Sequence, residues 1–293
     1  MSGDAPLASV RSLLFAPGNE ERKLRGALES DADAVIADLE DAVPAAEKDR
    51  AREVVREVLG EGRADDARGA GGARAVGEPA EPGPSPLRLL RIAAPADLEL
   101  AAELRVDAVV VPKATAAAVS ELRAGPPVVA IVETPAGLRE AHAIASSPAV
   151  SALMLGAVDL SVALGLEPYG DGLELLFARS SIAVDSAAAG IQRPIDSPCL
   201  DFRDLDVVRR EAEQARALGF AGKACIHPAQ VAVVNAAFTP SAEQVEWAQS
   251  TLAALAEAER EGRGAVALAG TMIDEPVAAR ARGILARTRR DGG

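Results

Sequence analysis

Short, nearly continuous apolar runs recur along this chain, and helical patterns separate them. The runs lie at 12–18, 34–41, 87–93, 108–113, 127–134, 152–159, 193–198 and 222–228. Continuous apolar runs of this length are typical of parallel strands covered on both faces, whereas half-exposed hairpin strands alternate apolar and polar residues. Eight such strands alternating with helices predict an α/β fold, a closed (β/α)8 TIM barrel.

The length of the chain, 293 residues, is one that α/β barrels use as a single domain. We expect the barrel over residues 1–238 and a C-terminal helical extension over 239–293, with Ser241 as the cap of its first helix. The extension serves either as a plug on the barrel or as an arm that reaches another subunit. The segment 60–86 is rich in Gly, Pro and charge and has no apolar periodicity, which predicts a flexible surface insertion without a catalytic role.

The net charge of −13 argues against nucleic acid or an anionic membrane as a partner, because both are polyanions. No apolar run approaches the roughly 18 residues that span a bilayer, and the N-terminus has no basic region followed by a long apolar stretch. Two cysteines, Cys199 and Cys225, are too few for a disulfide framework, so we expect reduced thiols. Together these features predict a cytoplasmic protein.

Polar residues interrupt nearly every apolar run at its C-terminal end, where the catalytic groups of βα barrels gather. They are Asp38, Glu40, Asp41, Arg91, Lys113, Glu133, Asp159, Asp196, Ser197 and His227. A single charged residue at a strand end is more often a helix cap or a solvated loop residue, so only the set carries weight. An excess of carboxylates with one Arg and one Lys predicts a site for a hard metal ion, with a cationic clamp for an acidic substrate.

Glu133 and Asp159 are the carboxylates that we expect to bind Mg²⁺. They follow the fifth and sixth runs, which are neighbours if strand order follows the sequence. Mg²⁺ typically takes one or two protein carboxylates, while water and substrate complete its coordination. Zinc is not expected, because the two histidines, His142 and His227, have no ligating set around them.

Two cations of the predicted mouth each allow two interpretations. Arg91 can bind a substrate carboxylate bidentately or form an ion pair with Glu40 or Asp41, and both can hold at once. Lys113 is either a Schiff-base nucleophile or a cation tied to the acidic cluster, and the metal hypothesis favours the second.

Seven motifs stand in order along the chain: RSLLFAPGN at 11–19, DADAVIADLEDAV at 31–43, VVVPKA at 109–114, IVETPAG at 131–137, LMLGAVDLSVALG at 153–165, GFAGKACIHPAQ at 219–230 and GTMIDEP at 270–276. In order and spacing they resemble the motifs of citrate lyase β-subunit-like proteins, which belong to the HpcH/HpaI aldolase/citrate lyase family. The resemblance implies a Mg²⁺-dependent carbon–carbon lyase. Its substrate would be a 3-hydroxyacyl thioester such as citryl-, malyl- or citramalyl-CoA, carried on CoA or on an acyl carrier protein.

The resemblance also implies roles for individual residues. Glu133 of the IVET motif and Asp159 of the LGAVDL motif would bind Mg²⁺, and Arg91 would bind substrate oxygen atoms. Asp274 of the GTMIDEP motif would reach the site of a neighbouring subunit as a catalytic acid or base. The C-terminal extension would then be an intersubunit lid, and the protein a homotrimer or a hexamer.

The remaining expected site residues are Glu40, as a catalytic group, and Pro17 and Gly18, as substrate contacts together with Arg91 and Glu133. Arg22, Lys23 and Arg25 can meet a CoA phosphate, although a solvated helix face is the simpler interpretation. Two positions depart from the family's pattern. Ala93 stands where an Asn commonly follows the Arg of the third strand, and Val158 replaces the carboxylate of the LGAEDL form.

Three other functions stay open at this point. A related aldolase would act on free pyruvate and an aldehyde without CoA. A subunit of a larger complex would be active only with an acyl carrier protein partner. A non-catalytic homologue would bind a ligand without turnover.

Overall fold

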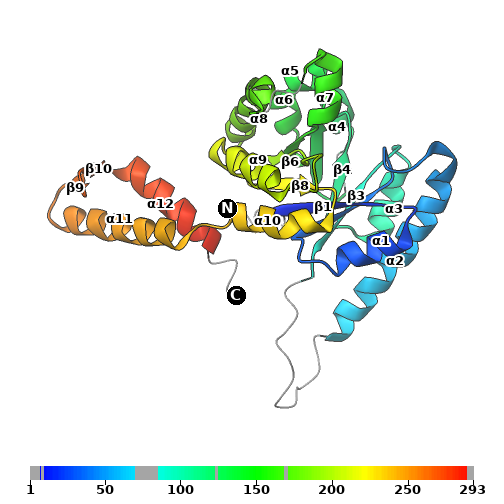
Figure 1. Cartoon of the computed structure of the whole chain (residues 1–293), viewed down its shortest axis with the longest axis horizontal. Helices are drawn as coiled ribbons and strands as arrows, with labels where there is room; N and C mark the ends of the chain where they lie inside the picture. The colour runs from blue at the N-terminus through cyan, green and yellow to red at the C-terminus, as the bar shows by residue number, and fades with distance from the viewer. Residues whose placement is uncertain (1–6, 8–9, 70–84, 123–124, 168–170, 289–293) are drawn as a thin grey trace. The chain divides into compact units, whose positions relative to one another are not determined.

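A computed structural model describes residues 7, 10–69, 85–122, 125–167 and 171–288, with only the backbone over 62–69. Eight parallel strands form a closed barrel in which each strand pairs with its neighbours in the sequence and β8 pairs with β1 (Figure 1). The strands are β1 (Ser12–Pro17), β2 (Ala34–Asp38), β3 (Leu87–Arg91), β4 (Ala108–Val111), β5 (Val128–Val132), β6 (Val150–Leu155), β7 (Ile195–Asp196) and β8 (Gly222–Cys225). The predicted (β/α)8 TIM barrel is confirmed.

Aliphatic side chains fill the barrel interior at every second position of the strands. Leu13, Ile36 and Leu89 are members of this interior cluster. Because side chains alternate between the two faces of a strand, the same period carries Asp38 and Arg91 to the inner face at the C-terminal ends of β2 and β3. The chain thus brings charge to one end of an otherwise apolar interior.

Helices follow the strands and cover the outside of the barrel (Figure 1). They are α1 (Glu21–Leu28), α2 (Lys48–Gly69), α3 (Asp97–Leu104), α4 (Ala116–Ser120), α5 (Pro135–Arg139), α6 (Ala141–Ala145), α7 (Ala157–Leu164), α8 (Leu176–Ala189), α9 (Leu205–Ala217) and α10 (Pro228–Phe238). Threonine caps fix where two of the short ones begin: Thr115 precedes α4 and Thr134 precedes α5, and each hydroxyl accepts a backbone N–H of its helix.

Two element boundaries differ from the prediction. α2 continues through Gly69, so the first part of the expected insertion is helical, while residues 70–84 lie outside the described residues. Apolar periodicity did not reveal this extension, but Ala, Arg and Glu are good helix formers without it. The run 152–159 is not one strand: β6 ends at Leu155 and α7 begins at Ala157, so Asp159 lies in the first turn of a helix.

The chain divides into two compact units, Met1–Ala236 and Ala237–Gly293. The second unit contains α11 (Ala242–Arg260), the antiparallel strands β9 (Val266–Leu268) and β10 (Thr271–Ile273), and α12 (Glu275–Thr288). Ser241 caps α11 as predicted, in a reciprocal capping box with Gln244. Leu255, Ile273 and Ala278 form a small core within this unit.

Both cysteines are buried free thiols, as predicted. Burial raises the pKa of Cys199 to about 11 and that of Cys225 to about 12, so neither forms a reactive thiolate near neutral pH. In the part of the chain that the structure describes, no helix has the length and apolar character needed to cross a bilayer.

Gly222, the first residue of β8, is a position at which the packing of the barrel can be tested. A Cβ at this position would lie 2.5 Å from the carbonyl oxygen of Arg11 and 2.6 Å from that of Val10, so the backbone would have to shift. We expect Gly222→Ala to lower the free energy of unfolding by about 1–3 kcal/mol, measured by urea denaturation.

Gly26 in the exposed face of α1 is the matched control, because nothing lies within 4 Å of an added Cβ there. Gly26→Ala should be neutral or stabilising by up to about 1 kcal/mol. Equal effects of the two substitutions would contradict this account of the packing at β8.

Candidate active site

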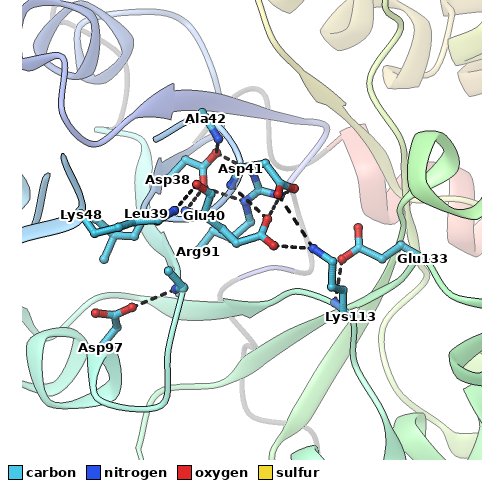
Figure 2. Close-up of polar contacts among 11 residues, drawn as sticks. Asp38, Leu39, Glu40, Asp41, Ala42, Lys48, Arg91, Asp97, Lys113 and Glu133 are labelled. Atoms are coloured by element: carbon cyan, nitrogen blue, oxygen red, sulfur yellow. Dashed lines mark hydrogen bonds and ion pairs between the residues drawn. The ribbon is translucent and has the colours of Figure 1, made fainter. Parts of the chain in front are cut away.

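Arg91, the last residue of β3, lies buried at the mouth of the barrel among three carboxylates (Figure 2). Its Nε and Nη2 donate to the two carboxylate oxygens of Asp38 at 2.7 and 2.5 Å. Its Nη1 contacts Glu40 Oε2 at 2.9 Å and Asp41 Oδ2 at 3.3 Å. The guanidinium also lies over the Phe15 ring, 5.2 Å from its centroid. Every nitrogen of the guanidinium therefore contacts a carboxylate, and the ion pair that the sequence allowed is present.

The loop after β2 is folded back so that its carboxylates reach Arg91. The Asp38 carboxylate accepts hydrogen bonds from the backbone N–H groups of Glu40 at 2.7 Å and Ala42 at 3.3 Å. Lys48, at the start of α2, donates from Nζ to the carbonyl oxygens of Leu39, at 2.6 Å, and of Glu40. Sequence analysis missed Lys48, since nothing in its neighbourhood distinguishes it from other charged residues of a helix start.

Glu40 bridges the two cations of the mouth (Figure 2). Its Oε1 accepts from Lys113 Nζ at 2.5 Å, while Oε2 contacts Arg91. Burial raises the pKa of the Glu40 carboxyl, and the hydrogen bond with Asp41 adds to this shift against the opposing effect of Lys113. The hydrogen bond to Glu40 raises the pKa of Lys113. Lys113 is thus tied to the acidic cluster, which is the interpretation that the metal hypothesis favoured.

Glu133 directly follows β5 and is buried. Its Oε1 accepts a hydrogen bond from the backbone N–H of Lys113 at 2.7 Å. Lys113 adopts a φ of 48°, a left-handed conformation that is uncommon for a residue with a side chain. Burial raises the pKa of Glu133 to about 7; the Lys113 N–H opposes this shift and the charge of Asp159 adds to it.

Asp159 approaches Glu133 from the first turn of α7, where a helix N-terminus favours a carboxylate. Gly156 leaves the room for this arrangement. A Cβ on Gly156 would lie 2.4 Å from Glu133 Cβ and 2.5 Å from Glu133 Oε2. The charge of Asp159 raises the pKa of Glu133, which shows that the two carboxylates repel each other. Such a pair is a donor set that suits a divalent cation.

Within the described ranges, no three or more His, Cys, Asp and Glu side chains are grouped so that they can hold a metal ion. A metal centre with protein ligands alone, such as structural zinc, needs such a group. Mg²⁺ does not, because it takes one or two carboxylates and keeps water or substrate oxygens at its other positions. The chemistry of the Glu133 and Asp159 pair therefore fits Mg²⁺.

Pro17 and Gly18 lie at the end of β1, where Pro17 pairs with Asp38 of β2. The Gly18 N–H is already used, since it donates to the carbonyl oxygen of Asp38 at 2.8 Å. An added Cβ on Gly18 would lie 2.8 Å from the same oxygen, so close packing against β2 explains the glycine. Of the basic residues that follow, Lys23 forms an ion pair with Glu20 at 2.7 Å and Arg25 with Glu21 at 2.8 Å, both on an exposed helix face.

Asp196 does not belong to the mouth cluster, contrary to expectation. Ile195 occupies the inner face of β7, so the next side chain points toward the surrounding helices. There Asp196 forms ion pairs with Arg179 of α8 at 3.0 Å and with Lys223 of β8 at 2.7 Å. A strand of two residues shows no periodicity in the sequence, which is why its faces could not be assigned beforehand.

Two other expected residues cap helices. His227 Nδ1 accepts the backbone N–H of Ala229 at 3.1 Å, at the start of α10. In the second unit, Asp274 Oδ1 accepts the backbone N–H of Val277 at 3.3 Å, at the start of α12. Asp274 is half-buried.

Asp97 is a buried residue of the site region that sequence analysis missed. Its Oδ2 accepts the N–H groups of Ala93 at 2.8 Å and Ala94 at 2.9 Å, and Arg52 Nε donates to Oδ1 at 2.6 Å. These bonds fix the loop after Arg91, where the family's usual Asn is absent. An Asp just before an apolar helical pattern is a helix-start signal that could have indicated it.

Known protein families and individual relatives match nearly the whole chain. Residues 11–228 match the model of the HpcH/HpaI aldolase/citrate lyase family, and residues 183–292 match a model described as a C–C bond lyase of the TIM-barrel fold. A citrate lyase subunit beta-like protein of Deinococcus radiodurans is 37% identical over 309 residues, with 96% of this chain and 98% of the relative covered. A (3S)-malyl-CoA thioesterase of Cereibacter sphaeroides is 36% identical over 287 residues, with 94% of each covered.

A solved structure shows the same fold. The chain superimposes on the crystal structure of CitE from Mycobacterium tuberculosis in complex with magnesium, acetoacetate and coenzyme A. The TM-score is 0.76 at 34% sequence identity, and 98% of this chain and 99% of that chain are covered. Because these matches cover nearly the full length and the fold is a closed barrel, the chain belongs to the HpcH/HpaI aldolase/citrate lyase family of carbon–carbon bond lyases.

Proposed function

We propose that the protein is a Mg²⁺-dependent lyase that cleaves, or in reverse condenses, a 3-hydroxyacyl thioester such as citryl-, malyl- or citramalyl-CoA. The products of cleavage are a 2-keto acid, such as oxaloacetate or glyoxylate, and an acetyl thioester. The observation that carries this proposal is the pair Glu133 and Asp159 beside the Arg91 cluster at the barrel mouth. The magnesium and coenzyme A in the related CitE structure support it.

Glu133 and Asp159 would hold the Mg²⁺ ion. When bound there, Mg²⁺ supplies a Lewis acid that polarises substrate oxygens and offsets their negative charge. The carboxylates of the mouth outnumber its cations, which gives the site a local preference for positive charge. This matters in a chain with a net charge of −13, because a carboxylate substrate needs local cations to be bound at all.

Arg91 is the group that would bind the substrate carboxylate. Asp38 holds its Nε and Nη2, so only the Nη1 edge can change partners. On that edge the contact with Asp41 is the longest, 3.3 Å, and the Asp41 side chain is 58% exposed. A substrate carboxylate can therefore displace Asp41 and keep the guanidinium neutralised.

Glu40 is the candidate for the proton transfer that starts cleavage. In this scheme Glu40 accepts the proton of the substrate hydroxyl, the C–C bond breaks, and its electron pair moves to the thioester half as an enolate. A proton delivered to the enolate carbon completes the acetyl thioester, and Asp274 of a neighbouring subunit is the proposed donor. Proton exchange with water then restores both carboxyl groups.

The test of the function is a product assay on the purified protein alone, with Mg²⁺ and with EDTA. Malyl-, citramalyl- and citryl-CoA are supplied, and keto acid and free thiol are measured separately. Lyase activity yields keto acid without free thiol, and it requires Mg²⁺. Glu133→Gln and Asp159→Asn should each reduce this activity by more than about 100-fold, the upper range for outer-shell substitutions at metal sites. Glu103→Gln on the exposed face of α3 is the control.

The same assay, extended to acyl carrier protein thioesters and to free 4-hydroxy-2-keto acids, separates the other candidates. Free thiol without keto acid would indicate thioester hydrolysis, the activity named for the relative from Cereibacter sphaeroides. Turnover only on acyl carrier protein thioesters would indicate a carrier-dependent subunit. Cleavage of a free 4-hydroxy-2-keto acid alone would indicate a pyruvate aldolase, and binding without any product a non-catalytic homologue. Each of these outcomes contradicts the proposal.

Glu40→Gln tests the proposed proton transfer. The amide keeps the shape of the side chain but cannot accept a proton, so we expect kcat to fall about 10²–10⁴-fold. Mg²⁺ affinity should change little, because Glu40 is held by Arg91 and Lys113 rather than by the metal pair. A variant with nearly normal kcat would exclude Glu40 as the base.

Asp274→Asn tests the contribution of a second subunit. If Asp274 acts across subunits, this variant and Glu133→Gln should each be inactive alone. Mixed and reassembled, they should regain part of the wild-type activity, since a barrel with an intact Glu133 then meets a neighbour with an intact Asp274. Recovery of no activity in mixed oligomers, shown to have formed by native mass spectrometry, would contradict the assignment.

A further inference from the structure

The seam between β6 and β7 is the least paired part of the barrel wall. β7 has two residues, and its pairing with β6 consists of the single register pair Met154 and Ile195. Asp159 lies on the β6 side of this seam, in the first turn of α7, the helix that comes after β6. A metal ligand needs a fixed position, and although β5 pairs with β6 at five positions, the strand ladder supplies little support on the β7 side.

The side chain of Ser197 supports the start of α7 on this side. Ser197, the residue after β7, is almost fully buried, and its Oγ accepts the backbone N–H of Ala157 at 3.3 Å. Ala157 is the first residue of α7, two positions before Asp159. The bond therefore ties the beginning of the helix that carries Asp159 to the end of β7, and it satisfies one of the N–H groups that a helix start leaves free.

A network of charged side chains around the buried Lys223 holds Ser197 in place. Lys223 Nζ donates to the Ser197 carbonyl oxygen at 2.6 Å and to Asp196 Oδ2 at 2.7 Å, and it contacts Glu211 Oε2 at 3.0 Å. These three partners match the three N–H bonds of an ammonium group. Asp196 also accepts from Arg179 Nε at 3.0 Å. Two cations face two carboxylates, so the network is neutral and needs no ion from solvent.

We infer that Ser197 is a positioning residue for Asp159, anchored by the buried Lys223 network and acting on the metal ligand through the N-terminus of α7. The inference rests on the proposed Mg²⁺ site and adds to it a residue outside the metal pair. None of the mouth carboxylates contacts Ser197 in the described structure, so its influence on the site passes through the backbone of α7.

The test measures metal affinity directly, on the full-length purified protein, with Mn²⁺ followed by electron paramagnetic resonance and displaced by Mg²⁺. Ser197→Ala should weaken Mn²⁺ binding about 10–100-fold, the range for outer-shell groups. Ser197→Thr keeps the hydroxyl and should recover most of the affinity. If the alanine variant does not fold, Ser197→Cys keeps the side-chain shape with a weaker acceptor and should show the same loss.

Ser151 offers a matched control. Its hydroxyl donates to the carbonyl oxygen of Val128 at 3.1 Å, at the opposite end of β6 from the site. Ser151→Ala should leave Mn²⁺ affinity unchanged, and thermal unfolding of all variants separates loss of affinity from loss of stability. Normal Mn²⁺ affinity in Ser197→Ala, or equal losses in both alanine variants, would overturn the inference.

The proposed metal site is judged separately in the same experiment. Wild-type protein should bind Mn²⁺, and Glu133→Gln should not. If the wild type binds and Glu133→Gln does not, a normal Ser197→Ala variant overturns only the role of Ser197. If wild type and Glu133→Gln behave alike, the metal site and the positioning role are both rejected.

Discussion

A buried guanidinium at the end of β3 is stable only while carboxylates surround it. Removing such an ion from water costs several kcal/mol, and the bidentate hydrogen bonds that Arg91 donates to Asp38 recover this cost best, because they satisfy two N–H groups along one edge of the guanidinium at once. The register of the barrel, in which Asp38 and Arg91 are partners on adjacent strands, makes this pairing available. The rest of the mouth is built outward from it.

The charges of the mouth alternate from this pair toward Glu133 and Asp159, the proposed metal ligands. Arg91 leaves one edge to Glu40, Glu40 takes Lys113 on its other oxygen, and Lys113 turns its backbone N–H, not its ammonium group, to Glu133. Glu133 therefore accepts a hydrogen bond from a neutral backbone N–H, whereas Asp38 and Glu40 contact charged side chains. Its raised pKa, about 7, follows from burial without a cationic partner. Among these carboxylates, Glu133, which feels the charge of Asp159, is the one without a cationic side chain bound to it.

Sequence alone predicted the barrel because eight apolar runs, each long enough to be covered on both sides, leave few alternatives. It also predicted that Glu133 and Asp159 belong together, since consecutive strands of such a barrel are neighbours. It did not predict that Asp159 lies on a helix, because Ala157 and Val158 continue the apolar run of β6 past Gly156. Nor could it separate Asp196 from the mouth, or find Lys223, since a buried cation inside a strand looks like an exposed one until its partners are known.

Backbone shape, more than side-chain identity, sets the geometry around Glu133. The left-handed Lys113 follows β4 and the side-chain-free Gly156 follows β6, so the two strands that flank β5 hold the carboxylate from both sides. The two departures from the family pattern lie elsewhere: Ala93 is held through its N–H by Asp97, and the Val158 side chain is 46% exposed. Neither side chain takes part in the network of Glu133. The carboxylate pair can therefore keep its arrangement when the residues at these two positions differ.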